Sequence, residues 1–353
     1  MSILRAGALC PRPECEILGA DERRRNSPMP IPALLRNRLR LPLIGAPMFI
    51  VSTPRLVVAQ CKAGIVGSFP ALNARPASEL DEWLGRIGEE LAAYARENPQ
   101  ARVAPFAVNQ IVHASNDRLE RDLETCVKHR VPIVITSLRP PAEAVAAVHG
   151  YGGIVLHDVI NIRHAEKAVS QGVDGIIAVC AGAGGHAGVL SPFALVKEIR
   201  AIFDGAIVLS GAMSTGADVL AARALGADLA YMGTRFIATE EANASEAYKR
   251  MLVESRAEDI VYTALFSGVA GNYLRASIAQ TGLDPDKLPA VDKSTMNFGS
   301  GGSSRWKAWK DIWSAGQSVS GIHDAPSVET VVARLADEYE AARQMLVKAI
   351  DCG

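Results

Sequence analysis

Short apolar runs alternate with longer segments of helical spacing over most of the chain. Each apolar run ends in small or polar residues, which is typical of a strand that turns into a helix. The predicted strands are LPLIGAPM (41–48), AGIVGSF (63–69), RVAPFAVNQ (102–110), VPIVITS (131–137), GGIVLHD (152–158), VDGIIAVC (173–180), GAIVLSG (205–211) and ADLAYMGT (227–234). The predicted helices between them are 76–98, 116–129, 141–149, 162–171, 192–203 and 215–225. This alternation predicts an α/β fold, a (β/α)8 TIM barrel; an open doubly wound sheet would alternate in the same way, and the number of units favours the barrel.

The pattern changes at both ends of the predicted barrel, which we place at residues 31–257. Residues 1–30 mix proline, arginine and acidic residues without any period, so we expect a flexible N-terminal tail. Residues 258–325 show little alternation and predict an irregular helical lid. The last segment, 326–353, contains an amphipathic helix from Ser327 to Ile350 that we expect to pack on the barrel.

Three tryptophans in the lid segment recur at helical spacing. Trp306, Trp309 and Trp313 are three and four residues apart, so they would form one aromatic stripe on a helix. We expect this stripe to pack the lid or to contact a second subunit of a homodimer, rather than to form an aromatic substrate box.

Composition narrows the classes of partner. A net charge of -1 gives no long-range field for a nucleic acid or an anionic membrane, and no apolar run is long enough to cross a bilayer. The six cysteines form no CxxC pair, so neither a zinc site nor a disulfide framework is expected, and a reducing cytoplasm fits best. We therefore expect a cytoplasmic protein that takes a small molecule and binds no metal.

In a barrel of this kind the functional residues lie where the strands end. Active sites form at the carboxyl ends of the strands, so the residues there converge on one pocket. That pocket is polar but nearly uncharged, because Asp158 is the one obvious carboxylate and no strand ends in a lysine. The absence of such a lysine argues against Schiff-base chemistry, and no His and carboxylate set is dense enough for a metal hydrolase.

The turns after the seventh and eighth strands favour a phosphate site. In LSGAMSTG and YMGTRF the backbone amides of Gly211, Ala212, Gly233 and Thr234 are expected to point at an anion, assisted by the helix that begins near Thr215. Ordinary glycine-rich turns are the alternative. A phosphate bound there would hold a flat ring over the barrel mouth, against the backbone of Ala46, Pro47 and Met48, with Asn109 at its edge.

The glycine-rich loop in IIAVCAGAGGHAGVLSP contains one side chain with a functional group, His186. Gly184 and Gly185 remove side chains beside His186, so the backbone can approach a ring or a small substrate. Flavin mononucleotide (FMN) meets these demands. His186 is then the candidate catalytic residue, whereas His157, at the end of the fifth strand, could contact the flavin or join a buried hydrogen-bond network.

Four motifs in this order resemble the nitronate monooxygenases, formerly called 2-nitropropane dioxygenases. They are IGAPM, AGGHAG, LSGAMSTG and MGTRFIAT, and the resemblance runs from Leu41 to Thr239 and more loosely to Arg275. It implies noncovalent FMN with its phosphate on Gly211 and on the run Tyr231, Met232, Gly233 and Thr234. It also implies that His186 acts as a base on a neutral nitroalkane or as a hydrogen-bonding partner of the anionic nitronate, with O2 as the second substrate.

Two positions depart from the pattern of this family. Ala183 and Val179 stand where members usually carry a glutamate and a glutamine, so the flavin surroundings are less polar here. Three functions stay open: oxidative denitrification of alkyl nitronates and nitroalkanes to carbonyl compounds and nitrite, an NAD(P)H-dependent flavin reductase of the enoyl or quinone type, and a non-catalytic flavin-binding protein.

Overall fold

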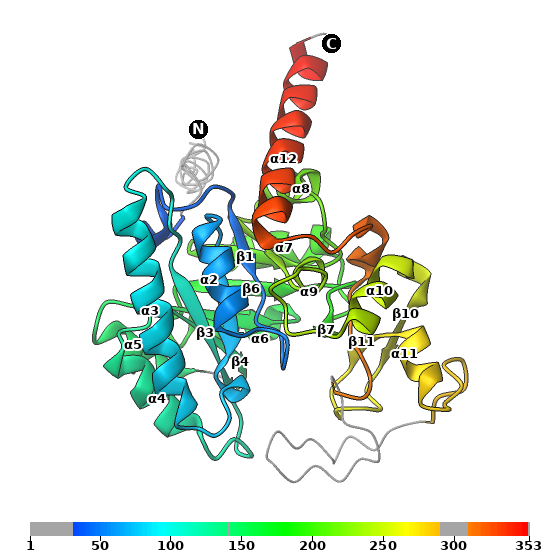
Figure 1. Ribbon diagram of the computed structural model, residues 1–353, viewed down its shortest axis with the longest axis horizontal. Helices are drawn as coiled ribbons and strands as arrows, with labels where there is room; N and C mark the ends of the chain where they lie inside the picture. Colours follow the sequence, from blue (N-terminus) through cyan, green and yellow to red (C-terminus); the bar gives the residue numbers. More distant parts are fainter. Residues whose placement is uncertain (1–30, 140, 290–309, 352–353) are drawn as a thin grey trace, which may run out of the picture.

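Eight parallel strands close into a barrel in the computed structural model, which describes residues 31–139, 141–289 and 310–351 (Figure 1). The strands follow the order β1-β9-β8-β6-β5-β4-β3-β2, and a bridge between Ile44 and Val66 joins the first strand to the last. Their bounds are β1 Leu43–Gly45, β2 Gly67–Pro70, β3 Phe106–Val112, β4 Ile133–Leu138, β5 Ile154–Val159, β6 Gly175–Val179, β8 Ala206–Ser210 and β9 Leu229–Met232. Each strand overlaps one predicted run, although β2, β3, β4 and β5 end one or two residues later than predicted, and the barrel prediction is confirmed.

Helices surround the barrel as expected. The six predicted helices are present as α3 Glu79–Glu97, α4 Leu119–Lys128, α5 Ala142–His149, α6 Ile162–Val169, α7 Pro192–Ile202 and α8 Gly216–Ala224. The others are α2 Pro54–Lys62, α9 Thr234–Ile237, α10 Glu246–Glu254, α11 Arg275–Gln280 and α12 Val328–Asp351, with 3-10 turns η1 Ala33–Leu35, η2 Ala71–Asn73, η3 Ala257–Asp259 and η5 Gln317–Gly321. No described helix is long and apolar enough to cross a membrane.

Strand side chains alternate between two apolar layers. Ile135, Leu156 and Ile177 fill the inside of the barrel, whereas Val134 and Val155 pack outward against the helices. Because strand residues alternate with a period of two, the same parity continues to the strand ends. It therefore decides which side chains at those ends face the site.

The segment after the barrel contains strands where a helical lid is expected. β10 Ile260–Thr263 and β11 Gly271–Leu274 form an antiparallel sheet with β7 Gly185–His186, which belongs to the glycine loop. The helical parts of this segment that the structure describes are α11 and the 3-10 turns η3 and η5. Residues 290–309, with Trp306 and Trp309, lie outside the described residues. A strand of four residues is too short to show an apolar period in the sequence. The pattern therefore does not reveal β10 and β11, whose pairing involves the glycine loop.

Trp313 lies at the start of the described segment that follows. Its ring stacks on Tyr248 of α10, with the ring centres 4.9 Å apart. This contact belongs to the packing of the segment on the barrel. The predicted tail, residues 1–30, also lies outside the described residues.

The C-terminal helix α12 packs on α8 and α2 through its first half and then projects beyond the barrel (Figure 1). Its Glu338 Oε2 accepts a hydrogen bond of 2.7 Å from Gly216 N, and Asp218 accepts from the amides of Ser214 and Thr215. The N-terminus of α8 is thus capped by carboxylates of the protein. The expectation that this helix directs its dipole at a bound phosphate is wrong, because these amides are used and none of the three residues lines the cavity.

Candidate active site

A cavity of about 610 Å³ opens at the carboxyl ends of the barrel strands. Its volume lies within the range typical of small-molecule and cofactor sites. Every predicted site residue except His157 lines it: Ala46, Pro47, Met48, Asn109, Gly184, Gly185, His186, Gly211, Ala212, Tyr231, Met232, Gly233 and Thr234. Residues from five separate stretches of sequence therefore meet where barrel geometry predicts.

His157 faces the helices instead. It has the outward parity of Val155 on β5, it is 3% exposed, and its Nδ1 lies 2.8 Å from Thr136 Oγ1. Burial lowers the pKa of His157 to about 4, and the positive field of His164 adds to this, so the ring is neutral. Of the two roles left open by the sequence, the structure shows a buried hydrogen bond. The neighbouring Asp158 has the inward parity and lines the cavity.

The glycine loop is held by segments that are distant in sequence. β7 pairs with β11, so that His186 lies opposite Gly271, and Gly185 N donates to Ser314 Oγ at 2.8 Å. A Cβ on Gly184 would lie 2.9 Å from Gly316 N and 3.0 Å from Thr234 Oγ1, which leaves no room for a side chain. Gly185 has a φ of +71° and its Cβ position is open, so a side chain there would be strained and would extend into free space.

A serine of the segment after the barrel contacts the ring of His186. The ring Nε2 lies 2.9 Å from Ser267 Oγ, and that hydroxyl also lies 3.0 Å from Val269 O. The tautomer protonated at Nε2 satisfies this arrangement, because Ser267 can then accept from the ring and donate to the carbonyl. Burial lowers the pKa of His186 to about 4, so the ring is neutral near pH 7 and can accept a proton.

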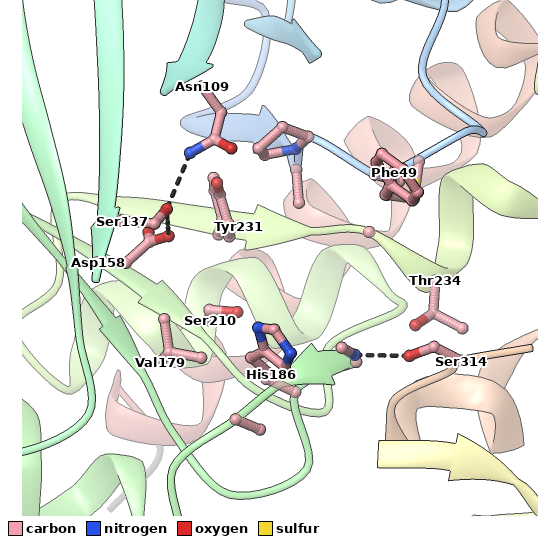
Figure 2. A pocket seen from close by; sticks show the side chains of 18 of the residues that line it. Phe49, Asn109, Ser137, Asp158, Val179, His186, Ser210, Tyr231, Thr234 and Ser314 are labelled. Carbon is pink, nitrogen blue, oxygen red and sulfur yellow. Dashed lines mark hydrogen bonds between the residues drawn. The ribbon is translucent and has the colours of Figure 1, made fainter. Parts of the chain in front are cut away.

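A cluster of polar side chains lies across the cavity from His186 (Figure 2). Asn109 Nδ2 donates to Ser137 Oγ at 2.9 Å, and Ser137 donates to Asp158 Oδ2 at 2.5 Å. Tyr231 lies beside them in Figure 2, and its pKa is raised by burial and by the negative charge of Asp158. Because Asn109 uses its NH2 group on the protein, its carbonyl oxygen is the group left for a ligand.

Asp158 is the unusual member of this cluster. Its Oδ1 is buried without a hydrogen-bond partner, and burial raises the pKa of the carboxyl to about 6. A buried unpaired carboxylate oxygen is costly, so it indicates a group that is protonated or that meets a ligand donor. Asp158 was noted in the sequence as a strand-end carboxylate without an assigned role.

The two predicted phosphate turns form one wall of the cavity. Gly211 and Ala212 have φ values of +153° and +50°, and Ala212 N donates to Gly182 O at 3.3 Å. Thr234 opens α9, and the first N–H groups of a helix have no acceptor within it. The amide of Ala212 is therefore already used, whereas the turn at Gly233 and Thr234 still has donors to offer to an anion.

Several lining residues were given no role from the sequence. Ser137 ends a predicted strand, and its inward parity brings it to the cavity. Ser267 and Ser314 belong to segments without a period, and no local signal marks them, whereas Tyr248 lies on helix α10. Val179 and Ala183, which the sequence analysis singled out, both line the cavity and give it apolar surface.

The donor set fits a flavin. One end of the cavity presents backbone turns without a bulky side chain, suited to a phosphate, and the polar cluster presents a carbonyl, a hydroxyl and a carboxyl, suited to the hydrogen-bonding edge of a flat ring. The orphaned Asp158 Oδ1 is a buried acceptor that a bound N–H group would satisfy. No described residues form a cluster of three or more ligands that could hold a metal ion.

A (β/α)8 barrel with this cavity defines a class: a flavin-dependent oxidoreductase. Comparison with known proteins then gives the family. Residues 35–338 match the model of the nitronate monooxygenase family, and the chain belongs to that family. The chain is 27% identical to the nitronate monooxygenase of Paraburkholderia phytofirmans over 352 residues, covering 86% of this chain and 94% of that protein.

Solved structures agree on the fold. FabK from Thermotoga maritima superimposes with a TM-score of 0.70 at 22% identity, covering 90% of this chain and 97% of that chain. Nitroalkane oxidase from Streptomyces ansochromogenes gives a TM-score of 0.69 at 21% identity, covering 89% and 100%. At these identities the likeness supports the barrel and not a substrate.

Proposed function

We propose that this chain binds FMN and oxidises alkyl nitronates, and nitroalkanes after removal of a proton, to carbonyl compounds and nitrite with O2. The observation that carries the proposal is His186, a neutral imidazole on a glycine loop, in a cavity whose described lining contains one carboxylate and no lysine. The family of the chain supports the same reaction.

The residues that would hold FMN follow from the donor set. The turns at Gly211 and at Gly233 to Thr234 would hold the phosphate, and Asn109 would accept a hydrogen bond from the ring edge. The small residues Ala46 and Pro47 leave space for a flat ring beside their backbone. Bound FMN would supply the acceptor for the electron pair that leaves the substrate.

His186 would act on the substrate in one of two ways. Its Nδ1 can accept the proton of a neutral nitroalkane carbon, because Nε2–H is held by Ser267. A nitronate has already lost that proton and carries negative charge. Binding of this anion would raise the pKa of His186 from its low value and favour a hydrogen bond from the protonated ring.

One experiment on the purified protein separates this function from its rivals. The proposal expects a yellow protein that releases FMN on denaturation and whose absorbance near the flavin maximum is lost when a nitronate is added without oxygen. Addition of NADH or NADPH under the same conditions is the control, and rapid bleaching by either would favour a reductase. A protein that binds FMN but is bleached by none of the three would be a flavin-binding protein without this activity.

A further inference from the structure

The outer part of the cavity carries one strong cation on an apolar wall. Arg75 is the only lysine or arginine among the described residues that line the cavity. Its Nε donates to Leu72 O at 3.0 Å, and its guanidinium carbon lies 5.1 Å from the centre of the Phe49 ring. No carboxylate pairs with it in the described part of the chain. A planar guanidinium stacked on an aromatic ring keeps its outer N–H groups for an anion.

The aromatic platform under Arg75 is fixed at a cost in backbone strain. The residue after Phe49 is Ile50, whose φ of +67° is unfavourable for a β-branched side chain. Asn73 holds this conformation: its Oδ1 accepts from Ile50 N at 2.9 Å, and its Nδ2 donates to the carbonyls of Met48 and Ser52. Strained residues persist only where their surroundings determine them, and they cluster at ligand sites.

The turn that carries Arg75 is also anchored. Arg118 donates to Ala74 O at 2.8 Å and to Ala71 O at 3.3 Å, and it pairs with the buried Asp122. The backbone next to Arg75 is therefore held by a buried ion pair. Its guanidinium lies on a prebuilt support and not on a free loop.

The lining of the same cavity includes apolar side chains that are open to solvent. Leu138, Ile160 and Tyr262 line the cavity, yet they are 37%, 40% and 44% exposed. Leu138 also has a left-handed φ of +81°. Apolar side chains that remain exposed at the mouth of a pocket are the surface that a ligand covers.

Two other titratable groups of the described lining carry no positive charge near pH 7. His164 of α6 lines the cavity, and its pKa is lowered by burial and then by the positive charges of Arg163 and Lys167, so its ring is neutral. Asp158 is the one acidic residue of the described lining, and it belongs to the polar cluster with Ser137. The described lining of the mouth therefore combines apolar walls with a single charged cation, Arg75.

We propose that the cavity mouth binds the distal part of the substrate, an apolar chain that ends in a carboxylate or a phosphate held by Arg75. The shared chemistry is an anion with two or more acceptor oxygens, which the guanidinium fork matches. The proposal takes one element from the function proposed above, namely that the reacting group of the substrate is a nitronate. It adds the class of substrate that the active site accepts: nitronates with a long apolar body and an anionic end.

Three nitronates test the proposal by steady-state kinetics with FMN-loaded protein. They derive from nitroethane, 1-nitrooctane and 8-nitrooctanoate. We expect KM to fall along this series. Arg75→Gln should raise KM for the carboxylate substrate by roughly 10- to 100-fold, the range for losing a hydrogen bond to a charged group, and change KM for 1-nitrooctane less than about twofold. Arg163→Gln, which removes a nearby cation that does not line the cavity, is the matched control and should leave all three KM values within about twofold.

An equal rise of all three KM values in Arg75→Gln, or no preference of the wild type for the carboxylate tail, would overturn the proposal. A binding arm without turnover separates this failure from failure of the proposed function. Octanoate, octyl phosphate and octanol are titrated into the FMN-loaded protein while the flavin spectrum is followed. Binding of either anion that is lost in Arg75→Gln supports the mouth site even if no nitronate reacts, and the tighter of the two identifies the anion. Nitronate turnover without any such binding supports the reaction and rejects the site.

Discussion

Two side chains of the cavity, His186 and Asp158, have pKa values that burial shifts in opposite directions. Burial lowers the pKa of His186 to about 4 and raises that of Asp158 to about 6, so near pH 7 the imidazole is neutral and the carboxyl is mostly ionised. The neutral imidazole has a lone pair for a proton, and the carboxylate is an acceptor for a ligand N–H or O–H group. These two groups are therefore where single substitutions test the chemistry most directly.

Replacement of His186 by asparagine separates a base from an anion partner. His186→Asn keeps a polar group of similar reach but cannot take a proton at a useful rate. Turnover of neutral nitroalkanes should fall by roughly 10²- to 10⁴-fold, and turnover of preformed nitronates should fall less. Oxygen consumption with both substrates measures the difference, with FMN content as the control. Equal large losses would make His186 an electrostatic partner of the nitronate, and unchanged rates would leave it a structural role.

Replacement of Asp158 by asparagine tests the shifted carboxyl through stability. The folded protein holds the Asp158 proton more tightly than the unfolded chain does, because the folded pKa is about 6 and the ordinary value is 3.8. The stabilisation from this group is therefore full below pH 3.8 and is lost as the pH rises through 6. Asp158→Asn cannot ionise, so its melting temperature without FMN should exceed that of the wild type more at pH 7.5 than at pH 4.5.

A second carboxyl provides the control for this experiment. Hydrogen bonds from Lys128 and His129 lower the pKa of the exposed Asp81, so its contribution has the opposite sign and is lost as the pH falls. Asp81→Asn should therefore show no gain at pH 7.5. If the two pH values give the same difference for Asp158→Asn, the carboxyl titrates as in the unfolded chain.

At the scale of elements, the site depends on turns that follow strands and on a loop that is paired from outside the barrel. Strand β7 of the glycine loop pairs with β11, and the turn at Gly233 connects β9 to α9. These are backbone features, so a change at one glycine can alter the site without changing a catalytic side chain. The turn at Gly233 offers the cleaner test.

Gly233→Asp should weaken FMN binding while the fold survives. A Cβ at this position would lie 3.5 Å from Ala46 Cβ and Met48 Sδ, which is ordinary contact. A carboxylate beside the phosphate would cost about 3 kcal/mol, or roughly a hundredfold in Kd. Gly233→Asn is the control of equal size without the charge. FMN titration of the apoprotein gives both constants, and equal affinities for the two variants would place the phosphate elsewhere.

At the scale of the whole molecule, the C-terminal helix α12 packs closely on the barrel helix α8. α12 crosses the start of α8 so tightly that a Cβ on Gly216 would lie 2.0 Å from Leu335 O and 2.4 Å from Tyr339 N. Buried Val331, Val332 and Leu335 lie on the packed half of the same helix. The C-terminal helix is therefore part of the folded unit.

Gly216→Ala should destabilise the protein by about 1–3 kcal/mol, because helix backbone cannot move aside as a flexible side chain can. Gly88→Ala is the matched control, since Gly88 lies on the exposed face of α3 with no atom within 4 Å of its Cβ position. That change should stabilise α3 by up to about 1 kcal/mol. Chemical unfolding of both variants measures the difference, and a Gly216→Ala variant as stable as the wild type would show that α12 is held loosely.

The sequence by itself determined the eight strands, the six helices and the glycine turns, because each depends on a local period or on the backbone freedom of one residue type. Order along the chain then placed Asn109, His186 and Gly233 at one face of the barrel, since the carboxyl ends of all its strands lie there.

Only the tertiary structure decided which side chains face the cavity and which distant segments contact each other. The parity of β5 turned His157 outward and Asp158 inward, and the short strands β10 and β11 found their partner in β7. Ser267 beside His186, Glu338 on the N-terminus of α8 and Arg75 on Phe49 are contacts between distant segments. Such contacts follow from how packed elements approach one another, and no periodic pattern in the chain encodes them.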